Sequence, residues 1–162
     1  DAVHLVIHSD YHPGNLLFSD GKVTGLFDFD WSRTDSRCFD VGLALTYFCT
    51  SWESEDNGRF QLDKAATFLE AYQGELKGSS GVGPLSSVEV RLLPHMLEAG
   101  SLYVLNWDVV DFYGKDTDPE EYLVYLQHNI RLIQWLKDSN NHAELIRTIG
   151  QVNCAPVSGH RR

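Results

Sequence analysis

The stretch His-Ser-Asp-Tyr-His-Pro-Gly-Asn, residues 8–15, decides how the rest of the chain is interpreted. The apolar run at residues 3–7 predicts a short strand before it, and the Pro-Gly pair inside it predicts a loop. Two more apolar runs follow at residues 15–18 and 23–27, and the polar Ser-Asp-Gly between them is typical of a hairpin turn. We therefore expect a loop held between a strand and a small β-hairpin.

This loop contains His-x-Asp followed, after four residues, by Asn, which is the spacing of the catalytic loop of protein kinases. Phosphoryl transfer needs a carboxylate beside the attacking hydroxyl. It also needs a neutral oxygen ligand for Mg²⁺ that leaves this carboxylate free. Asp10 is therefore the candidate catalytic base, and Asn15 is a candidate metal ligand.

A second carboxylate follows the apolar run at residues 23–27. We expect this run to be a buried strand that holds Asp28 rigidly at its end. Mg²⁺ prefers one or two carboxylates together with phosphate oxygens and waters. Asp28 is therefore the principal candidate metal ligand, and Asp30, two residues later, is a second candidate that either assists it or faces solvent.

Three blocks in this order and at these intervals resemble the aminoglycoside phosphotransferase and type II homoserine kinase superfamily. They are residues 8–15, Leu-Phe-Asp-Phe-Asp at 26–30, and Phe-Asp-Val-Gly at 39–42. The specific part of the resemblance lies in the first 45 residues, and the helical remainder resembles the family far less distinctively.

The resemblance implies a role for each matching residue. Asp10 would be the catalytic base, Asn15 and Asp28 would bind Mg²⁺, and Asp40 would brace the catalytic loop from the next helix. It further implies the C-terminal lobe of a protein-kinase-like fold, ATP as phosphoryl donor and Mg²⁺ as cofactor.

Two departures from protein kinases shape the expected function. Asp30 stands where protein kinases carry Gly and no Ala-Pro-Glu block follows, which favours a small-molecule acceptor over a protein. The sequence also lacks a Gly-rich loop and a strand Lys paired with a helix Glu, the parts that hold ATP. The first strand has no preceding element to pair with. We therefore expect this chain to be a fragment of a larger protein, whose N-terminal ATP-binding lobe is the missing partner. We also expect the chain to be inactive alone.

Three other residues near the loop have structural alternatives. We expect His8 to pack beneath the loop, since Asp10 already fills the role of base. His12 either contacts substrate or shapes the loop, and the neighbouring Pro and Gly favour shaping. Asp40 either braces the loop or caps a helix, and both roles are structural.

An acidic cluster at the start of the last third of the chain is a candidate substrate surface for an amine. Asp108 and Asp111 are its principal members. Charge runs usually face water, so a solvated acidic loop is the favoured alternative. The other members are Asp116, Asp118, Glu120 and Glu121.

The remainder predicts helices, which makes the fold α+β and mainly helical. Apolar spacing predicts helices at 41–48 and 61–76, and a linker at 78–84. Ser86 or Ser87 is expected to cap a helix to about 112, with Pro94 a potential kink and Gly100 a weak point. Two more are expected at 119–137 and 141–149. We expect one lobe over residues 1–150 and a flexible tail over 151–162.

Composition excludes several classes of function. The chain is 43% hydrophobic and 22% charged, as expected of a globular domain, and its formal net charge of -10 argues against nucleic acid and anionic membranes. No stretch approaches the roughly 20 apolar residues of a membrane span, and no signal peptide is evident. We expect a cytoplasmic protein with free thiols, because its three cysteines fit neither a disulfide scaffold nor a zinc site.

Two questions stay open at the level of sequence. The rival to an enzyme is a kinase-like binding or regulatory module without catalysis. The acceptor is also undetermined among aminoglycosides, homoserine, choline-like amino alcohols and sugars, because acceptor contacts come from variable loops and helices.

Overall fold

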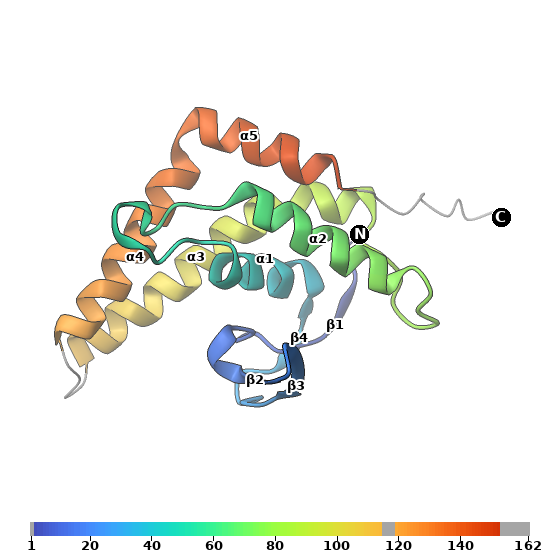
Figure 1. Cartoon of the computed structure of the whole chain (residues 1–162), viewed down its shortest axis with the longest axis horizontal. Coiled ribbons are helices and arrows are strands. Elements are labelled where there is room, and N and C mark those ends of the chain that lie inside the picture. The colour runs from blue at the N-terminus through green and yellow to red at the C-terminus, as the bar shows by residue number, and fades with distance from the viewer. Residues whose placement is uncertain (1, 115–118, 153–162) are drawn as a thin grey trace.

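The protein is mainly helical, with two small antiparallel sheets on one side of a helical body (Figure 1). The structure is a computed structural model that describes residues 2–114 and 119–152. The predicted α+β class is therefore confirmed. The helices are α1 Arg37–Phe48, α2 Leu62–Leu76, α3 Ser87–Gly114, α4 Pro119–Lys137 and α5 Ser139–Gly150.

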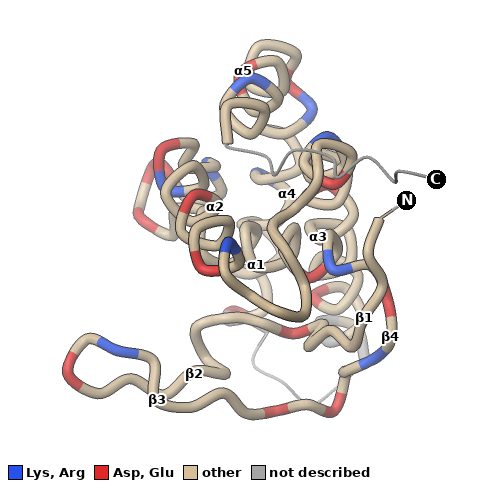
Figure 2. The backbone as a smooth tube through the Cα atoms, turned by 90° about the vertical axis from the view of Figure 1, so that its right-hand side faces the viewer, with Lys and Arg blue, Asp and Glu red and all other residues tan. Residues whose placement is uncertain are grey.

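The two sheets each contain two strands. β2 (Leu16–Ser19) and β3 (Lys22–Leu26) form the predicted hairpin, which protrudes from the helices (Figure 2). β1 (His4–Ile7) pairs with β4 (Arg33–Ser36), with Leu5 opposite Asp35. The strand that pairs with β1 therefore follows it in the chain, and the sequence did not predict that strand. This partner, β4, is too polar to be recognised as a strand by its sequence.

Helix α1 begins four residues earlier than predicted. Ser36 adopts an extended backbone, and its hydroxyl accepts a hydrogen bond from the amide of Cys38, so Ser36 is the N-cap. Arg37 and Cys38 are both buried in the first turn. The sequence placed the start too late because an Arg at a buried position gives no apolar signal.

Helices α1 and α3 pack unusually close together because glycine stands on each at the crossing. A Cβ atom added to Gly42 would lie 2.7 Å from the backbone carbon of Met96, and one added to Gly100 would lie 3.2 Å from the Cα of Leu43. Gly100, predicted to be a weak point, is instead a contact point of the core. Helix α3 also continues through Pro94 without ending.

The core joins all five helices. Its fully buried side chains come from α1, α2, α3, α4 and α5, and from the loop before α2. Val152, in the predicted tail, is only 4% exposed and belongs to this core, whereas residues 153–162 lie outside the described part of the chain. Cys38 and Cys49 are free and buried. Among the residues described, no helix is both long and apolar enough to cross a membrane.

A buried ion pair connects the first turns of α1 and α3. Arg37 donates from Nη2 to Oε2 of Glu89 at 2.7 Å and from Nε to Oε1 at 2.8 Å. Both side chains are almost completely buried, at 4% and 1% exposed. Glu89 also accepts hydrogen bonds from the amides of Val3 and Ser86, and Ser86 and Glu89 form a reciprocal capping box. The pair thus ties β1, α1 and α3 together.

The hydrogen bonds to Glu89 dominate its titration. Burial alone would raise the pKa of Glu89, but the hydrogen bonds from Arg37, Ser86 and Val3 outweigh burial and lower it from 4.5 to about 2. A carboxyl whose pKa is depressed by folding stabilises the folded state above its unfolded pKa. It loses this contribution as the pH falls toward its folded pKa. The contribution of Glu89 is therefore complete above pH 4.5 and declines between 4.5 and about 2.

We expect Glu89→Gln to lower the free energy of unfolding at pH 7 by about 3 kcal/mol, because it leaves the buried Arg37 guanidinium without its counter-charge. Urea unfolding between pH 3 and 7 measures the effect. The variant should also lose less stability on acidification than the parent. The exposed Glu75→Gln is the control. If the free energy of unfolding of Glu89→Gln changes with pH in parallel with that of the parent, the lowered pKa does not belong to Glu89.

Candidate active site

The loop at residues 8–15 is anchored to α1 by Asp40. Its two carboxylate oxygens accept hydrogen bonds from consecutive backbone amides, Oδ1 from Ser9 at 2.8 Å and Oδ2 from His8 at 3.2 Å. The alternative that Asp40 caps the helix was wrong, because Ser36 is the cap. Asp40 instead fixes the backbone immediately before Asp10.

His8 connects this loop to the end of the hairpin. Its side chain is buried, and Nδ1 accepts a hydrogen bond from the amide of Asp10 at 3.3 Å. Since Nδ1 accepts, Nε2 carries the proton and donates to the carbonyl oxygen of Phe27 at 3.0 Å. The ring also packs on Phe29, with centroids 4.9 Å apart. His8 thus lies under the loop and contacts both Asp10 and the residue before Asp28.

Asp10 and Asn15 are in direct contact. The side-chain nitrogen of Asn15 donates both to the carbonyl oxygen of Asp10, at 2.9 Å, and to its carboxylate Oδ2, at 3.0 Å. Asn15 is buried, and its side-chain oxygen makes no hydrogen bond within the described part of the chain. One end of the amide therefore holds Asp10, and the other remains available as an oxygen ligand.

His12 both shapes the loop and faces Asp10. Its Nδ1 accepts a hydrogen bond from the amide of Gly14 at 3.1 Å, so the proton of the neutral ring lies on Nε2, 3.5 Å from Oδ2 of Asp10. This ring is the largest influence on Asp10 and lowers its pKa below the ordinary value. Burial opposes the shift, and the hydrogen bond from Asn15 adds to it. Asp10 is therefore held as a carboxylate at neutral pH.

Ser9, the residue before Asp10, has a strained backbone conformation. Ser9 is completely buried at φ 64°, a left-handed conformation that favours glycine, and its hydroxyl has no hydrogen-bond partner in the described residues. Strain of this kind persists only where the surrounding contacts impose it, and it concentrates at functional sites. Here the two amide bonds to Asp40 supply that constraint.

Asp28 lies next to the loop, but not on a buried strand. The amide of Phe27 donates to the carbonyl oxygen of Asn15 at 3.2 Å, which joins the end of the hairpin to the loop. Asp28 adopts φ 62°, and both Asp28 and Asp30 are exposed. The predicted burial of the run at 23–27 was wrong, since the side chains of β3 are largely exposed. Phe27 donates one hydrogen bond to Asn15 and accepts another from His8, so hydrogen bonds, rather than burial, hold the backbone next to Asp28.

The donor atoms around Asn15 and Asp28 suit Mg²⁺. One amide oxygen and one carboxylate are hard oxygen ligands, and Mg²⁺ commonly takes only one or two protein carboxylates and completes its shell with phosphates and water. The described residues contain no group of three or more His, Cys, Asp or Glu arranged to hold a metal. An amide oxygen and a carboxylate are thus the donor types by which Asn15 and Asp28 fit Mg²⁺.

A cavity of about 710 Å³ opens beside His12, between the loop, α1, α3 and α4. Asp108 lies on its α3 wall, 8% exposed, and its Oδ2 accepts a hydrogen bond from the side-chain nitrogen of Asn129 at 2.7 Å. The solvated-loop interpretation was wrong for Asp108, because the residue belongs to a helix and faces this cavity. The side chain of Asp111 and residues 115–118 lie outside the part of the chain that the structure describes.

Sequence reasoning missed several residues of this cavity. Tyr47 on α1 packs against the ring of His12, with centroids 5.1 Å apart. Burial, and then the carboxylates of Asp10 and Asp108, raise the pKa of Tyr47, so its hydroxyl stays a hydrogen-bond donor. In the sequence, the position of Tyr47 is typical of an aromatic core residue. No local signal shows that its helix borders a cavity. The others missed are Trp52, Lys64, His128 and Asn129.

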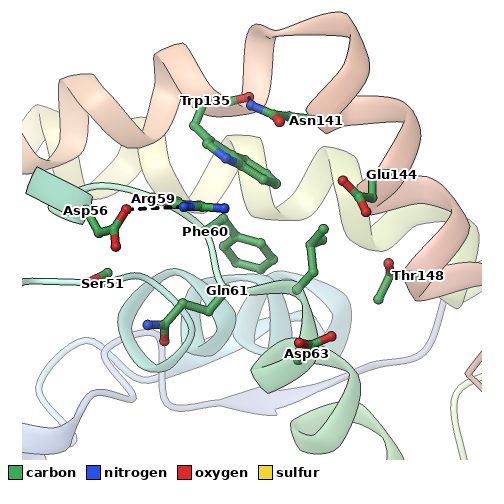
Figure 3. Close-up of a pocket in the computed structure, with 11 residues that line it drawn as sticks. Ser51, Asp56, Arg59, Phe60, Gln61, Asp63, Trp135, Asn141, Glu144 and Thr148 are labelled. Carbon is green, nitrogen blue, oxygen red and sulfur yellow. Dashed lines mark hydrogen bonds and ion pairs between the residues drawn. The ribbon is translucent and has the colours of Figure 1, made fainter.

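A second cavity of about 440 Å³ lies between the loop at 51–61, α2, α4 and α5 (Figure 3). Polar side chains surround Phe60 and Trp135 there, and Asp56 forms an ion pair with Arg59 at 3.2 Å. It contains none of the residues that the sequence predicts for catalysis. Of these two cavities, the one beside His12 is therefore the one that borders the loop at residues 8–15.

Comparison with known proteins identifies the family of this chain. The sequence model of the family "Phosphotransferase enzyme family" matches residues 2–76, which include the loop, the hairpin and α1. A homoserine kinase of Parvibaculum lavamentivorans is 30% identical over 134 residues, 78% of this chain and 38% of the relative. One of Polaromonas naphthalenivorans is 36% identical over 95 residues, 59% of this chain and 27% of the relative. One of Methylocella silvestris is 26% identical over 145 residues, 87% of this chain and 41% of the relative.

The chain thus spans less than half the length of these curated relatives. The family match covers the segment in which Asp40 and Asn15 contact residues 8–10 of the loop. The chain belongs to the phosphotransferase superfamily of aminoglycoside phosphotransferases and type II homoserine kinases.

Proposed function

We propose that residues 1–150 form the C-terminal catalytic lobe of an ATP-dependent kinase that phosphorylates a hydroxyl group of a small molecule. The observation that carries this proposal is the double hydrogen bond from the Asn15 side chain to Asp10, at 2.9 and 3.0 Å. It brings the proposed base and a proposed metal ligand together. The backbone bond from Phe27 to Asn15 supports the inclusion of Asp28, the next residue, in the same site.

Each residue of the loop has a distinct task in this proposal. Asn15 and His12 both approach Oδ2 of Asp10, which leaves Oδ1 to orient the acceptor hydroxyl and receive its proton. Asn15, through its free side-chain oxygen, and Asp28 would hold Mg²⁺, with Asp30 a further candidate. A metal ion held by these residues would supply positive charge to offset the negative charge of the phosphates. His8 and Asp40 would keep the loop in this arrangement.

The cavity beside His12 is the proposed acceptor site. It begins next to Asp10 and contains a buried carboxylate, Asp108, as well as an exposed ammonium group, Lys64. Opposite charges in one cavity suit an acceptor that carries both an amine and a carboxylate beside its hydroxyl. Homoserine, the substrate named for the relatives, has these three groups. We therefore propose homoserine or a similar hydroxy amino acid as acceptor.

The exposed face of the hairpin is the proposed contact with an N-terminal lobe and its nucleotide. Large apolar side chains are exposed here, close to Asp28, and such patches mark interaction surfaces. The relatives are more than twice as long as the matched segment, which agrees with a further lobe. The exposed residues of this surface are Leu17, Phe18, Val23, Leu26, Phe27 and Phe29.

We expect Asp10→Ala to lower kcat by a factor of about 10² to 10⁴ in the protein that carries both lobes, because the acceptor hydroxyl loses its base. Phosphorylation of homoserine, followed by ADP release, measures the change. Mg·ATP affinity should be retained, since Asp10 does not bind the metal in this proposal. Asp20→Ala, at the exposed hairpin turn, is the control. Turnover equal to that of the parent would refute the role of Asp10.

We expect Asp28→Ala to weaken Mg·ATP binding itself by about tenfold or more, because a carboxylate ligand of the metal is removed. Calorimetry on the two-lobe protein and on the present chain gives the affinities, with Asp20→Ala again as the control. Unchanged affinity in Asp28→Ala would remove Asp28 from the metal site. If neither protein binds Mg·ATP, the non-catalytic binding module becomes the better description.

A further inference from the structure

His128 occupies an unusual position in the wall of the proposed acceptor cavity. It lies on α4, only 2% exposed, and lines the cavity together with Asp108 and Asn129. Its ring stacks flat on that of Trp52, with centroids 3.5 Å apart and planes inclined by 4°. Stacking on an indole fixes the plane of the imidazole. The ring nitrogens therefore have defined directions.

The tautomer of His128 follows from its partner. Nδ1 lies 2.5 Å from Oδ1 of Asn57, and since a side-chain carbonyl oxygen can only accept, Nδ1 carries the proton. The segment that carries Asn57 is pressed against α4. Gly58 has φ 84°, and a Cβ atom added to it would lie 2.4 Å from Cβ of Arg131 and 2.8 Å from the carbonyl oxygen of His128. The contact with Asn57 is therefore built into the packing of this loop.

The same imidazole is uncharged at neutral pH. Burial, and secondarily the nearby charge of Arg131, lower the pKa of His128 to about 4. With the proton on Nδ1, Nε2 presents a lone pair and can only accept a hydrogen bond. His128 is thus a fixed acceptor and not a donor.

Nε2 has no hydrogen-bond partner among the described residues. It is also not completely enclosed, because the fully buried side-chain atoms without partners in that part of the chain are the hydroxyls of Ser9 and Ser32. An oriented acceptor on a side chain that is 2% exposed, in the wall of a ligand-sized cavity, costs free energy unless water or a ligand supplies a donor.

We propose that Nε2 of His128 accepts a hydrogen bond from the primary ammonium group of the acceptor, and that His128 thereby selects acceptors with N–H donors over N-methylated ones. This inference rests on the proposed function, since it concerns the same cavity. A primary ammonium has three N–H donors, enough for both Nε2 of His128 and the carboxylate of Asp108 on the neighbouring wall. A trimethylammonium group keeps the charge but has no donor, so it leaves Nε2 unpaired.

The first experiment measures binding to the present chain without ATP. Three ligands differ only at the amine: L-homoserine, N,N,N-trimethylhomoserine and 4-hydroxybutanoate. Nitrogen-15 NMR of the histidine rings reports the hydrogen bond directly, because a lone-pair nitrogen shifts upfield when it accepts one. We expect an upfield shift of Nε2 of His128 with L-homoserine and not with the other two. Absence of any shift with L-homoserine overturns the inference.

Variants separate the acceptor role from packing. His128→Gln keeps an oxygen acceptor near the position of Nε2, whereas His128→Phe keeps a ring to stack on Trp52 but removes the acceptor. We expect His128→Phe to weaken L-homoserine binding by about tenfold or more and His128→Gln to retain most of it. His95→Phe, on an exposed face of α3, is the matched control. Thermal unfolding of each variant identifies any loss of fold.

The outcomes distinguish this inference from the proposed function. If L-homoserine shifts Nε2 but the two-lobe protein does not phosphorylate it, the kinase proposal fails and the binding role of His128 stands. If the two-lobe protein phosphorylates L-homoserine and its trimethyl derivative with equal kcat/KM, the selectivity fails alone. A folded His128→Phe variant that binds L-homoserine as tightly as the parent also overturns it.

Discussion

The buried pair of Arg37 and Glu89 is the interaction on which the rest of this architecture depends. Burying two opposite charges costs hydration free energy, which their mutual attraction must offset. Here the neighbouring hydrogen bonds also help to offset this cost. Glu89 accepts a hydrogen bond from the amide of Val3, immediately before β1. Arg37 donates hydrogen bonds to the carbonyl oxygens of Gly83 and Pro84, before α3. Segments from three separate parts of the chain therefore meet at one ion pair.

This arrangement has a direct consequence for the loop at residues 8–15. The first turn of α1 contains both Arg37 and Asp40, so the ion pair that fixes the turn also fixes the carboxylate that holds the loop. Asp40 in turn holds Ser9 in a strained backbone conformation. The strain is sustained by the core of α1 and α3, whose backbones approach closely at Gly42. A rigid helical scaffold thus determines the position of Asp10.

The loop lies between two surfaces of different character. On one side the hairpin exposes apolar side chains and the carboxylate of Asp28, and on the other the cavity beside His12 is lined by aromatic and polar groups. In the proposed reaction the first surface meets the phosphoryl donor and the second meets the acceptor. This division explains why Asp10, whose pKa is lowered by His12, stands at the boundary between them.

Sequence alone determined the local chemistry of this protein. The spacing of Asp10, Asn15, Asp28 and Asp40, the hairpin and most of the helices are encoded by short-range patterns, because turn residues and apolar periodicity act within a few neighbours. Only the tertiary structure decided which distant residues meet. The pairing of β1 with β4, the burial of Asp108 and the meeting of Tyr47, Trp52 and His128 around one cavity depend on contacts across tens of residues. Such contacts follow from how helices pack together, and no local spacing encodes them.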